Sequence, residues 1–89
     1  MNRQEFEESM LLLKKQVKML IDEIGMRAEF YEVKYAHDLP QGSKYGYHIR
    51  LEYNGYNTTD IFTDIMTFDV ADINRMAVLL VSSFFRDYI

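Results

Sequence analysis

Residues 44–55, KYGYHIRLEYNG, constrain the fold more than any other segment of the chain. Apolar and aromatic side chains occupy every second position of this segment, namely Tyr45, Tyr47, Ile49, Leu51 and Tyr53. Such an alternation predicts a strand with one buried face. The dipeptide Asn54-Gly55 that follows favours a tight hairpin turn, because both residue types tolerate positive φ angles. The chain is therefore expected to build an antiparallel sheet.

The N-terminal segment, residues 3–24, predicts a long amphipathic helix. Its apolar residues recur at alternating spacings of four and three: Phe6, Met10, Leu13, Val17, Leu20 and Ile24. Leu12, Met19 and Ile21 widen this stripe. Asn2 and Glu5 have the spacing of a capping box, and Gly25 is placed to end the helix. The same spacing is also typical of a short parallel coiled coil, but the wide stripe favours packing on a sheet.

Residues 28–37 predict a first strand, in which Tyr31, Val33 and Tyr35 share one face. Residues 37–44, HDLPQGSK, contain the proline of this chain and a glycine, and they predict a turn or loop. If the hairpin turn at Asn54-Gly55 had two residues, Ile49 would lie opposite Asp60. A three-residue loop with a bulge would instead place Ile49 opposite Ile61, and we expect that arrangement.

Residues 60–68 are open to two interpretations. As a helix, they would group Ile61, Phe62, Ile65 and Met66 on one face. As a strand, they would direct alternate residues from Ile61 to Thr67 into the core and Phe62, Asp64, Met66 and Phe68 outwards. We favour the strand, because Asp69 suits the N-cap of the next helix and Phe68 suits the preceding staple position. Both roles require an extended chain.

The last helix is expected over residues 70–88. The 89 residues therefore predict one α+β domain, residues 1–89, in the order α-β-β-β-α. This architecture is a three-stranded antiparallel sheet with both helices packed on one face.

The composition and charge of the chain argue against several classes of protein. The chain has no cysteine, which excludes disulfides and thiolate metal sites. Its longest apolar run, MAVLLV, is far shorter than a membrane span, and the charged N-terminal residues do not resemble a signal peptide. A cytoplasmic location without membrane binding is expected. The net charge of −4 argues against direct nucleic-acid binding.

Acidic residues dominate the stretch between Arg50 and Arg75, which contains no lysine or arginine. Asp69 is explained as the N-cap of the last helix, and Asp72, three residues on, by the helix macrodipole. The remaining carboxylates lie among tyrosines, and we expect this hairpin to bind a basic partner protein through Glu52, Tyr53, Tyr56, Asp60 and Asp64. The alternative is an ordinary solvated sheet face.

Two further surfaces are candidates for binding. Phe62, Met66 and Phe68, joined by Phe30, would form an exposed apolar patch on the outer sheet face, suited to self-association as a homodimer. A small basic cluster in and after the first helix would offer weak RNA or DNA binding: Lys14, Lys15, Lys18 and Arg27. The sequence has no nucleophile motif, phosphate-binding loop or dinucleotide fingerprint, so neither enzymatic activity nor a cofactor or metal is expected.

The α-β-β-β-α order resembles the double-stranded-RNA-binding domain. That family contacts phosphates with lysines at the start of its second helix, where this chain has DVADINR with Asp69 and Asp72. The chain also resembles small acidic inhibitor proteins of phages and mobile elements, anti-CRISPR proteins among them, in its size, its lack of cysteine and its hairpin EYNGYNTTDIFTD. This second resemblance implies an inhibitor that occupies a nucleic-acid-binding surface of a host protein.

These observations predict a non-enzymatic protein-binding module that docks its acidic, tyrosine-rich hairpin on a basic surface. A homodimeric structural or regulatory domain, or a weak double-stranded-RNA-binding-like domain, is the alternative.

Overall fold

A computed structural model describes residues 2–39, 42–57 and 61–88 of the chain, and for residues 37–39, 42–44, 56–57 and 87–88 it describes the backbone only. The elements are α1 (Arg3–Glu23), β1 (Glu29–Leu39), β2 (Gly42–Tyr53), β3 (Tyr56–Asn57), β4 (Ile61–Asp64), the 3-10 turn η1 (Val70–Asp72) and α2 (Ile73–Tyr88). The expected α+β class and α-β-β-β-α order are confirmed, with β3 and β4 sharing the place of the third strand.

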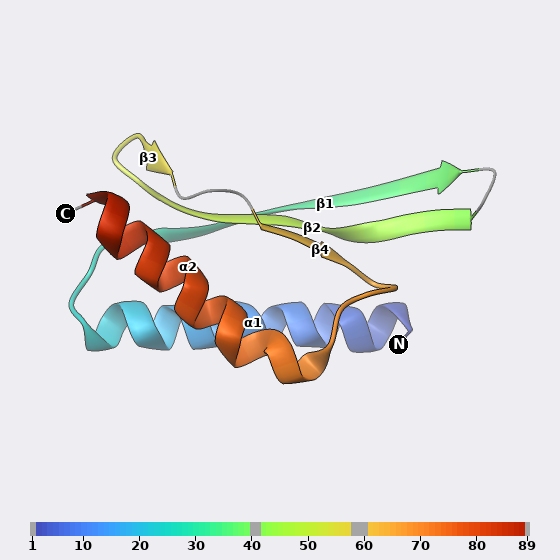
Figure 1. Ribbon diagram of the computed structural model, residues 1–89, viewed down its shortest axis with the longest axis horizontal. Helices are drawn as coiled ribbons and strands as arrows, with labels where there is room; N and C mark the ends of the chain where they lie inside the picture. Colours follow the sequence, from blue (N-terminus) through green and yellow to red (C-terminus); the bar gives the residue numbers. More distant parts are fainter. Residues whose placement is uncertain (1, 40–41, 58–60, 89) are drawn as a thin grey trace.

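The sheet is antiparallel, and β2 is its central strand. β1 pairs along one edge of β2, while β3 and β4 pair along the other. Both helices lie on the same side of the sheet, so the molecule has two layers (Figure 1). One face of the sheet is therefore covered by helices, and the outer face carries no element of the described chain.

Both ends of α1 are set by local hydrogen bonds. The Asn2 side chain accepts from the Glu5 amide at 2.8 Å, and the Glu5 carboxylate accepts from the Asn2 amide, which completes the expected capping box. At the other end, Gly25 has a φ of 67°, and the amide of Met26 reaches back to the Ile21 carbonyl. These are the bonds of a Schellman motif, which glycine permits because it lacks a Cβ.

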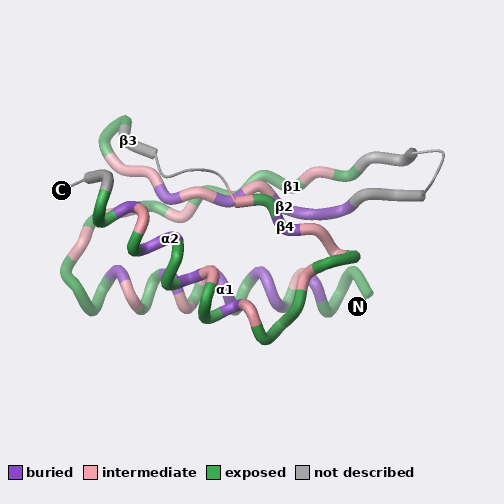
Figure 2. Tube along the Cα trace, viewed as in Figure 1, coloured by how far each residue is buried: buried purple, intermediate pink, exposed green. Residues whose placement is uncertain are grey.

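The core lies between the helices and the inner face of β2 (Figure 2). Its largest fully buried side chains are Phe6, Phe84, Leu13, Ile49, Leu51, Leu80 and Val17. The expected apolar stripe of α1 is thus directed at the sheet and α2, except at its last residue, Ile24, which is the C-cap and is exposed. The expected widening of the stripe is wrong at Leu12 and Met19, which are exposed, because α2 and the sheet already fill the space against α1.

The hairpin turn has two residues, with Asn54 at a φ of 54° and Gly55 at 86°, so Tyr53 pairs with Tyr56. The expected three-residue loop is therefore wrong. The expected pairing of Ile49 with Ile61 is confirmed. The pairing of β2 with β3 and the pairing of β2 with β4 differ in register by one residue. The one-residue offset therefore arises between Asn57 and Ile61 and not in the turn.

The strand expected over residues 60–68 ends early, at Asp64. The Asp64 side chain accepts from the Met66 amide at 2.8 Å, and its carbonyl accepts from the amides of Thr67 and Phe68. This turn breaks the strand alternation. Phe68 therefore packs on the core side, where its ring meets Phe6 at a centroid distance of 5.6 Å, and its expected outer position is wrong.

The first strand also differs from expectation. Tyr31, Val33 and Tyr35 do share a face, but it is the outer one, because Phe30 pairs with the inward-facing Leu51 and packs against the core. The expected outer position of Phe30 is therefore wrong. The loop expected over residues 37–44 is largely strand, since β1 continues to Leu39 and β2 begins at Gly42.

The entry to α2 agrees with the expected capping role of Asp69. Its side chain accepts from the Ala71 amide at 3.0 Å, while its own backbone is extended. The first turn is a 3-10 turn, and α2 proper begins at Ile73. Asp72 forms an ion pair with Arg75 at 3.2 Å.

Candidate functional site

The outer face of the sheet presents side chains from three strands. Because directly paired residues share a face, the register fixes its members: Glu29, Tyr31, Val33 and Tyr35 from β1, His48, Arg50 and Glu52 from β2, and Phe62 and Asp64 from β4. Helices cover only the opposite side of the sheet (Figure 1). This surface is a candidate for binding and is named the outer face below.

Aromatic and cationic side chains contact one another laterally on this face. The rings of His48 and Phe62 stack at a centroid distance of 4.5 Å. The Arg50 guanidinium lies 4.0 Å from the centre of the Tyr31 ring, which is a cation–π geometry. Phe62 remains 67% exposed and Met66, just beyond β4, is 80% exposed. Large apolar surface is therefore open to solvent here.

Two glutamates lie directly opposite each other at the hairpin end of the outer face. Glu29 pairs with Glu52 across β1 and β2, and both belong to the lining of a hollow of about 330 Å³. The other lining residues are Tyr53, Asn54 and Gly55. We call this hollow the carboxylate hollow. Like charges directly opposite on neighbouring strands repel, and Arg50 offsets part of this repulsion through its Nε, 3.3 Å from Glu52 Oε2.

Tyr35 closes the other end of the outer face. Its hydroxyl donates to the Thr63 carbonyl at 2.8 Å, and its ring lies over Gly46. Burial, followed by the nearby charge of Asp64, raises the pKa of the Tyr35 hydroxyl above its usual value. Glycine at position 46 leaves the space that the tyrosine ring occupies, so this end is filled from within the chain.

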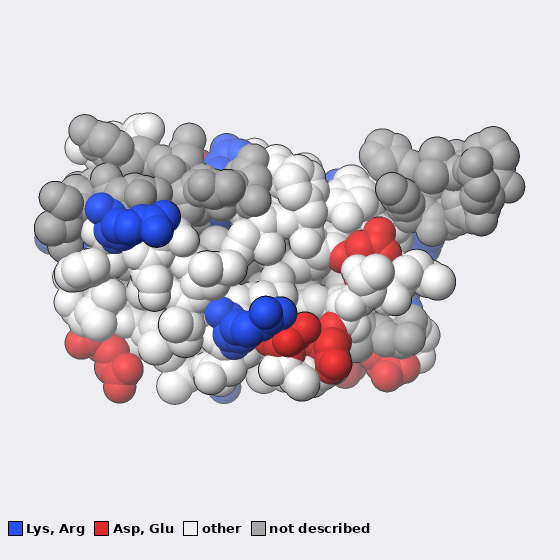
Figure 3. Space-filling model, viewed as in Figure 1, with Lys and Arg blue, Asp and Glu red and all other residues white. Residues whose placement is uncertain are grey.

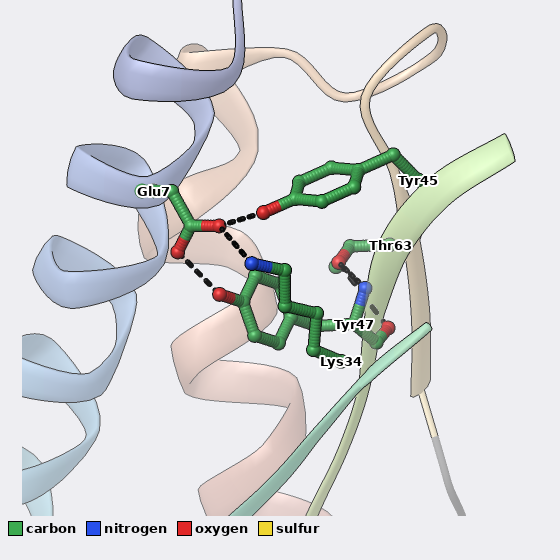
Figure 4. A network of polar contacts seen from close by, with 5 residues as sticks. All are labelled: Glu7, Lys34, Tyr45, Tyr47 and Thr63. Carbon is green, nitrogen blue, oxygen red and sulfur yellow. Dashed lines mark hydrogen bonds and ion pairs between the residues drawn. The ribbon is translucent and has the colours of Figure 1, made fainter. Parts of the chain in front are cut away.

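The inner face contains a second polar cluster, drawn in Figure 4. The Glu7 carboxylate of α1 accepts from the hydroxyls of both Tyr45 and Tyr47, and it lies 3.4 Å from the Lys34 ammonium. Thr63 approaches from β4, where its Oγ1 accepts from the Tyr47 amide at 3.2 Å. This cluster joins α1 to the sheet.

The pKa shifts in this cluster follow from its contacts. Partial burial raises the pKa of Glu7, but the two tyrosine hydroxyls and Lys34 outweigh burial and lower it overall. The pKa of Lys34 is raised, first by its contact with the Tyr45 hydroxyl and then by the charge of Glu7. Burial and the bond to Glu7 raise the pKa of Tyr47. These shifts favour the ionised carboxylate of Glu7, the charged ammonium of Lys34 and the neutral phenol of Tyr47.

A groove of about 420 Å³ runs between β4 and α2, on the side away from β1. Phe62, Phe68, Met76 and Leu79 supply its apolar lining, and Asp64, Asp69 and Asp72 its carboxylates. Each of these aspartates already receives a backbone amide or pairs with an arginine. On the face shown in Figure 3, basic and acidic side chains adjoin each other near the lower middle, and the other charged side chains are separated by uncharged surface.

The residues expected to bind a partner do not form one cluster. Glu52 and Tyr53 line the carboxylate hollow. Asp64 lies opposite Gly46, six residues from Glu52 along β2, which is about 20 Å at the rise of a strand. Tyr56 is described only by its backbone pairing with Tyr53, and Asp60 lies outside the described residues.

The surface expected for self-association is also divided. Phe62 and Met66 are exposed, whereas Phe68 packs on the core side and meets Phe62 only in the lining of the groove between β4 and α2. In the basic cluster, Lys14 pairs with Glu32 at 3.7 Å.

The sequence interpretation missed Glu29, Tyr31, His48 and Arg50 as candidate site residues. The signal that identifies them is the register of β1 on β2. Pairing Phe30 with Leu51 places Glu29 opposite Glu52 and Tyr31 opposite Arg50.

Among the described residues, no group of three or more histidine, aspartate and glutamate side chains is arranged to hold a metal ion. In the same part of the chain, neither helix has the length and apolar character needed to cross a lipid bilayer. Comparison with models of known protein families, with curated proteins and with solved structures finds no significant match.

Proposed function

We propose that the protein is a non-enzymatic binding module that docks its outer face on a basic surface of another protein. One observation carries this proposal: Glu29 and Glu52 lie directly opposite each other in an open hollow that Tyr53 also lines. A cationic side chain of a partner, entering this hollow, would relieve the repulsion between the two carboxylates.

Arginine fits the hollow better than lysine. Its planar guanidinium can donate to two carboxylates at once and can also stack on an aromatic ring. Within the protein itself, Arg50 makes both kinds of contact, with Glu52 and with the ring of Tyr31. Because Glu29 forms no ion pair with another described residue, it keeps a negative charge available for a partner.

The aromatic and apolar part of the outer face would provide the remaining contact area. Phe62 is exposed and its ring stacks on His48, and Met66, just beyond β4, is also exposed. Aromatic anchors beside charged groups are typical of the residues that dominate protein interfaces. The net charge of −4 supports attraction to a basic partner and a faster association at low salt.

The likeness to phage and mobile-element inhibitors, anti-CRISPR proteins among them, supports a more specific form of this proposal. In that form, the basic partner is a host protein and the surface that is covered is one that binds nucleic acid. The lack of cysteine supports a cytoplasmic site of action. No cofactor takes part in this proposal.

The test measures binding of a labelled arginine-rich peptide by fluorescence anisotropy at low salt. The double variant Glu29→Gln/Glu52→Gln should bind about tenfold more weakly, since two charge-assisted contacts are lost. The matched control, Glu8→Gln/Asp22→Asn, removes the same charge from exposed positions on α1 and should retain most of the affinity. Equal losses in both variants would assign the binding to net charge alone and would contradict the proposed site.

A second candidate function is a homodimeric structural or regulatory domain. The exposure of Phe62 and Met66, at 67% and 80%, favours self-association through the outer face. The variant Phe62→Ser/Met66→Ser would reduce the mass measured by light scattering if this face is the dimer interface. An unchanged mass would exclude it.

A further inference from the structure

β1 is an open edge strand of 11 residues. Within the described sheet it pairs only with β2, and its residues from Tyr31 to Lys34 are exposed. An edge of this length offers a row of unpaired backbone groups to another strand, and proteins usually protect such an edge or use it for assembly.

The hydrogen bonds of β2 show which backbone groups of β1 point outwards. The Tyr47 amide donates to Thr63 Oγ1 and its carbonyl accepts from the same hydroxyl, so the backbone of Tyr47 is directed at β4. Because the backbone directions alternate along a strand, the backbone of the neighbouring His48 is directed at β1, where His48 pairs with Val33. The backbone of Val33 is therefore directed at β2, and the amides and carbonyls of Glu32 and Lys34 are directed at the open edge.

We propose that two copies of this protein pair through β1 in an antiparallel arrangement, with the two-fold axis at Val33. Glu32 of each copy then lies opposite Lys34 of the other, in a position where both exchange backbone hydrogen bonds. A self-complementary contact of this kind is what a two-fold dimer requires, because each pair occurs twice. This inference concerns a different surface from the carboxylate hollow and does not depend on the proposed function.

The charges select this register over its neighbours. Only every second residue of β1 directs its backbone groups at the open edge. The allowed registers therefore differ from one another by a shift of two residues. The adjacent register on one side would place Glu32 opposite Glu32, and the one on the other side would place Lys34 opposite Lys34. Like charges directly opposite are destabilising, whereas opposite charges stabilise a strand pair. The two-fold axis at Val33 is therefore the arrangement that the sequence of β1 favours.

The charged contacts inside each copy extend this pairing. Lys14 lies 3.7 Å from Glu32, and Glu7 lies 3.4 Å from Lys34. Across the dimer, the four side chains would form a row of alternating charge, running from Lys14 and Glu32 of one copy to Lys34 and Glu7 of the other. Leu11 is 67% exposed and shares the helix stripe of Glu7 and Lys14, so its apolar surface lies beside this row.

On the outer face, the same register would place Tyr31 of each copy opposite Tyr35 of the other. Val33 would meet its own counterpart at the axis. The aromatic surface of the two copies would then be continuous, because β1 of one copy would adjoin β1 of the other within a single sheet.

The first experiment measures mass by light scattering over a concentration series, for the wild type and for two charge variants. The wild type should approach twice its chain mass of 10.6 kDa as concentration rises. Lys34→Glu makes both edge charges acidic, and Glu32→Lys makes both basic. Each variant alone should remain monomeric, because like charges would then oppose each other in every pair.

An equimolar mixture of the two variants provides the decisive test. In the mixed dimer the acidic residues at positions 32 and 34 of one copy face basic residues at positions 34 and 32 of the other, so the mixture should recover the dimer mass. Circular dichroism on each variant alone confirms that it is folded before mixing. A wild type that stays monomeric overturns the proposal, and so does a mixture of folded variants that fails to associate.

Hydrogen exchange gives an independent readout at single residues. The amides of Glu32 and Lys34 should become protected as concentration rises, whereas the amide of Val33 should be protected at every concentration by β2. If the amides of Glu32 and Lys34 exchange rapidly in a dimer, the dimer forms through another surface and the β1 pairing is wrong.

Discussion

The two faces of β2 differ in which elements their side chains contact. On the inner face, Tyr45 and Tyr47 are buried and their hydroxyls reach Glu7 of α1. On the outer face, His48 stacks on Phe62 and Arg50 covers Tyr31, so the contacts run sideways within the sheet. The inner face is thus closed by another layer of the chain. The described contacts of the outer face join side chains of the sheet to one another.

The inner face should show the largest effect on stability. Phe6 is fully buried and contacts the rings of Tyr45, Tyr47 and Phe68. Phe6→Ala should lower the free energy of unfolding by about 3–5 kcal/mol through lost burial and a residual cavity. Denaturant unfolding followed by circular dichroism measures this change. A loss below about 1 kcal/mol would mean that the inner face is far less tightly packed than described.

The outer face has one position at which the fold itself is sensitive. A Cβ built on Gly46 would lie 1.8 Å from the Thr63 carbonyl oxygen and 2.6 Å from the Tyr35 hydroxyl. Gly46→Ala should therefore destabilise the protein by about 1–3 kcal/mol, the usual range for overpacking. The same substitution in a Tyr35→Ala background removes only the side-chain clash. If that background abolished the whole penalty, the backbone contact with Thr63 would be of no consequence.

Loss of the Glu7 carboxylate should have a smaller effect. Glu7→Gln weakens the bonds from both tyrosine hydroxyls and removes the ion pair with Lys34, and the site is partly exposed. A loss of about 1 kcal/mol in unfolding free energy is expected. Glu8→Gln, one position along on the exposed side of α1, serves as the control and should be nearly neutral. Equal effects of the two variants would remove the special role assigned to Glu7.

The same cluster predicts a dependence of stability on pH. Because the folded-state pKa of Glu7 is lowered, its stabilising contribution is fully present above the unfolded-state pKa of about 4.3. The contribution is lost as pH falls through the lower, folded-state pKa. Unfolding curves measured from neutral to acidic pH should therefore converge for the wild type and Glu7→Gln. Parallel curves would contradict the lowered pKa.

The smallest effect on stability is expected from the exposed outer face. Phe62→Ser and Met66→Ser should each change the free energy of unfolding by no more than about 0.5 kcal/mol, since both side chains are mostly in solvent. Thermal unfolding measures this directly. A large loss at Phe62 would show that its stacking on His48 supports the fold, and the contrast between the two faces would then be weaker than we infer.

Much of the fold could be predicted from local patterns. The capping box of Asn2 and Glu5 and the glycine at position 25 define α1, because these signals act within a few residues. The pairing of Ile49 with Ile61 followed from the need to bury isoleucine on the inner face. These are consequences of short-range geometry and hydrophobic pattern.

The features that could not be predicted depend on contacts between distant residues. Strand alternation continued past Asp64 predicts an outer position for Phe68. A side-chain hydrogen bond of Asp64 instead starts a turn there. The carboxylate hollow was missed because the register between β1 and β2 is set across a hairpin whose loop bounds were wrong. Phe30 was placed on the wrong face for a related reason, since both faces of β1 carry aromatic side chains.

The offset of one residue between the two ladders on β2 restricts how the chain can vary in length. Between Asn57 and Ile61 lie three residues, and their number decides which side chains of β4 turn inwards. If β4 shifted by one residue, Thr63, which is 3% exposed, would turn outwards. An added residue would bring Phe62 to its place opposite Tyr47, and a removed residue would bring Asp64 there. A shift of two residues would keep Thr63 and Phe62 on their present faces, two positions along β2. Changes in the number of residues between β3 and β4 should therefore be tolerated in steps of two and not in steps of one.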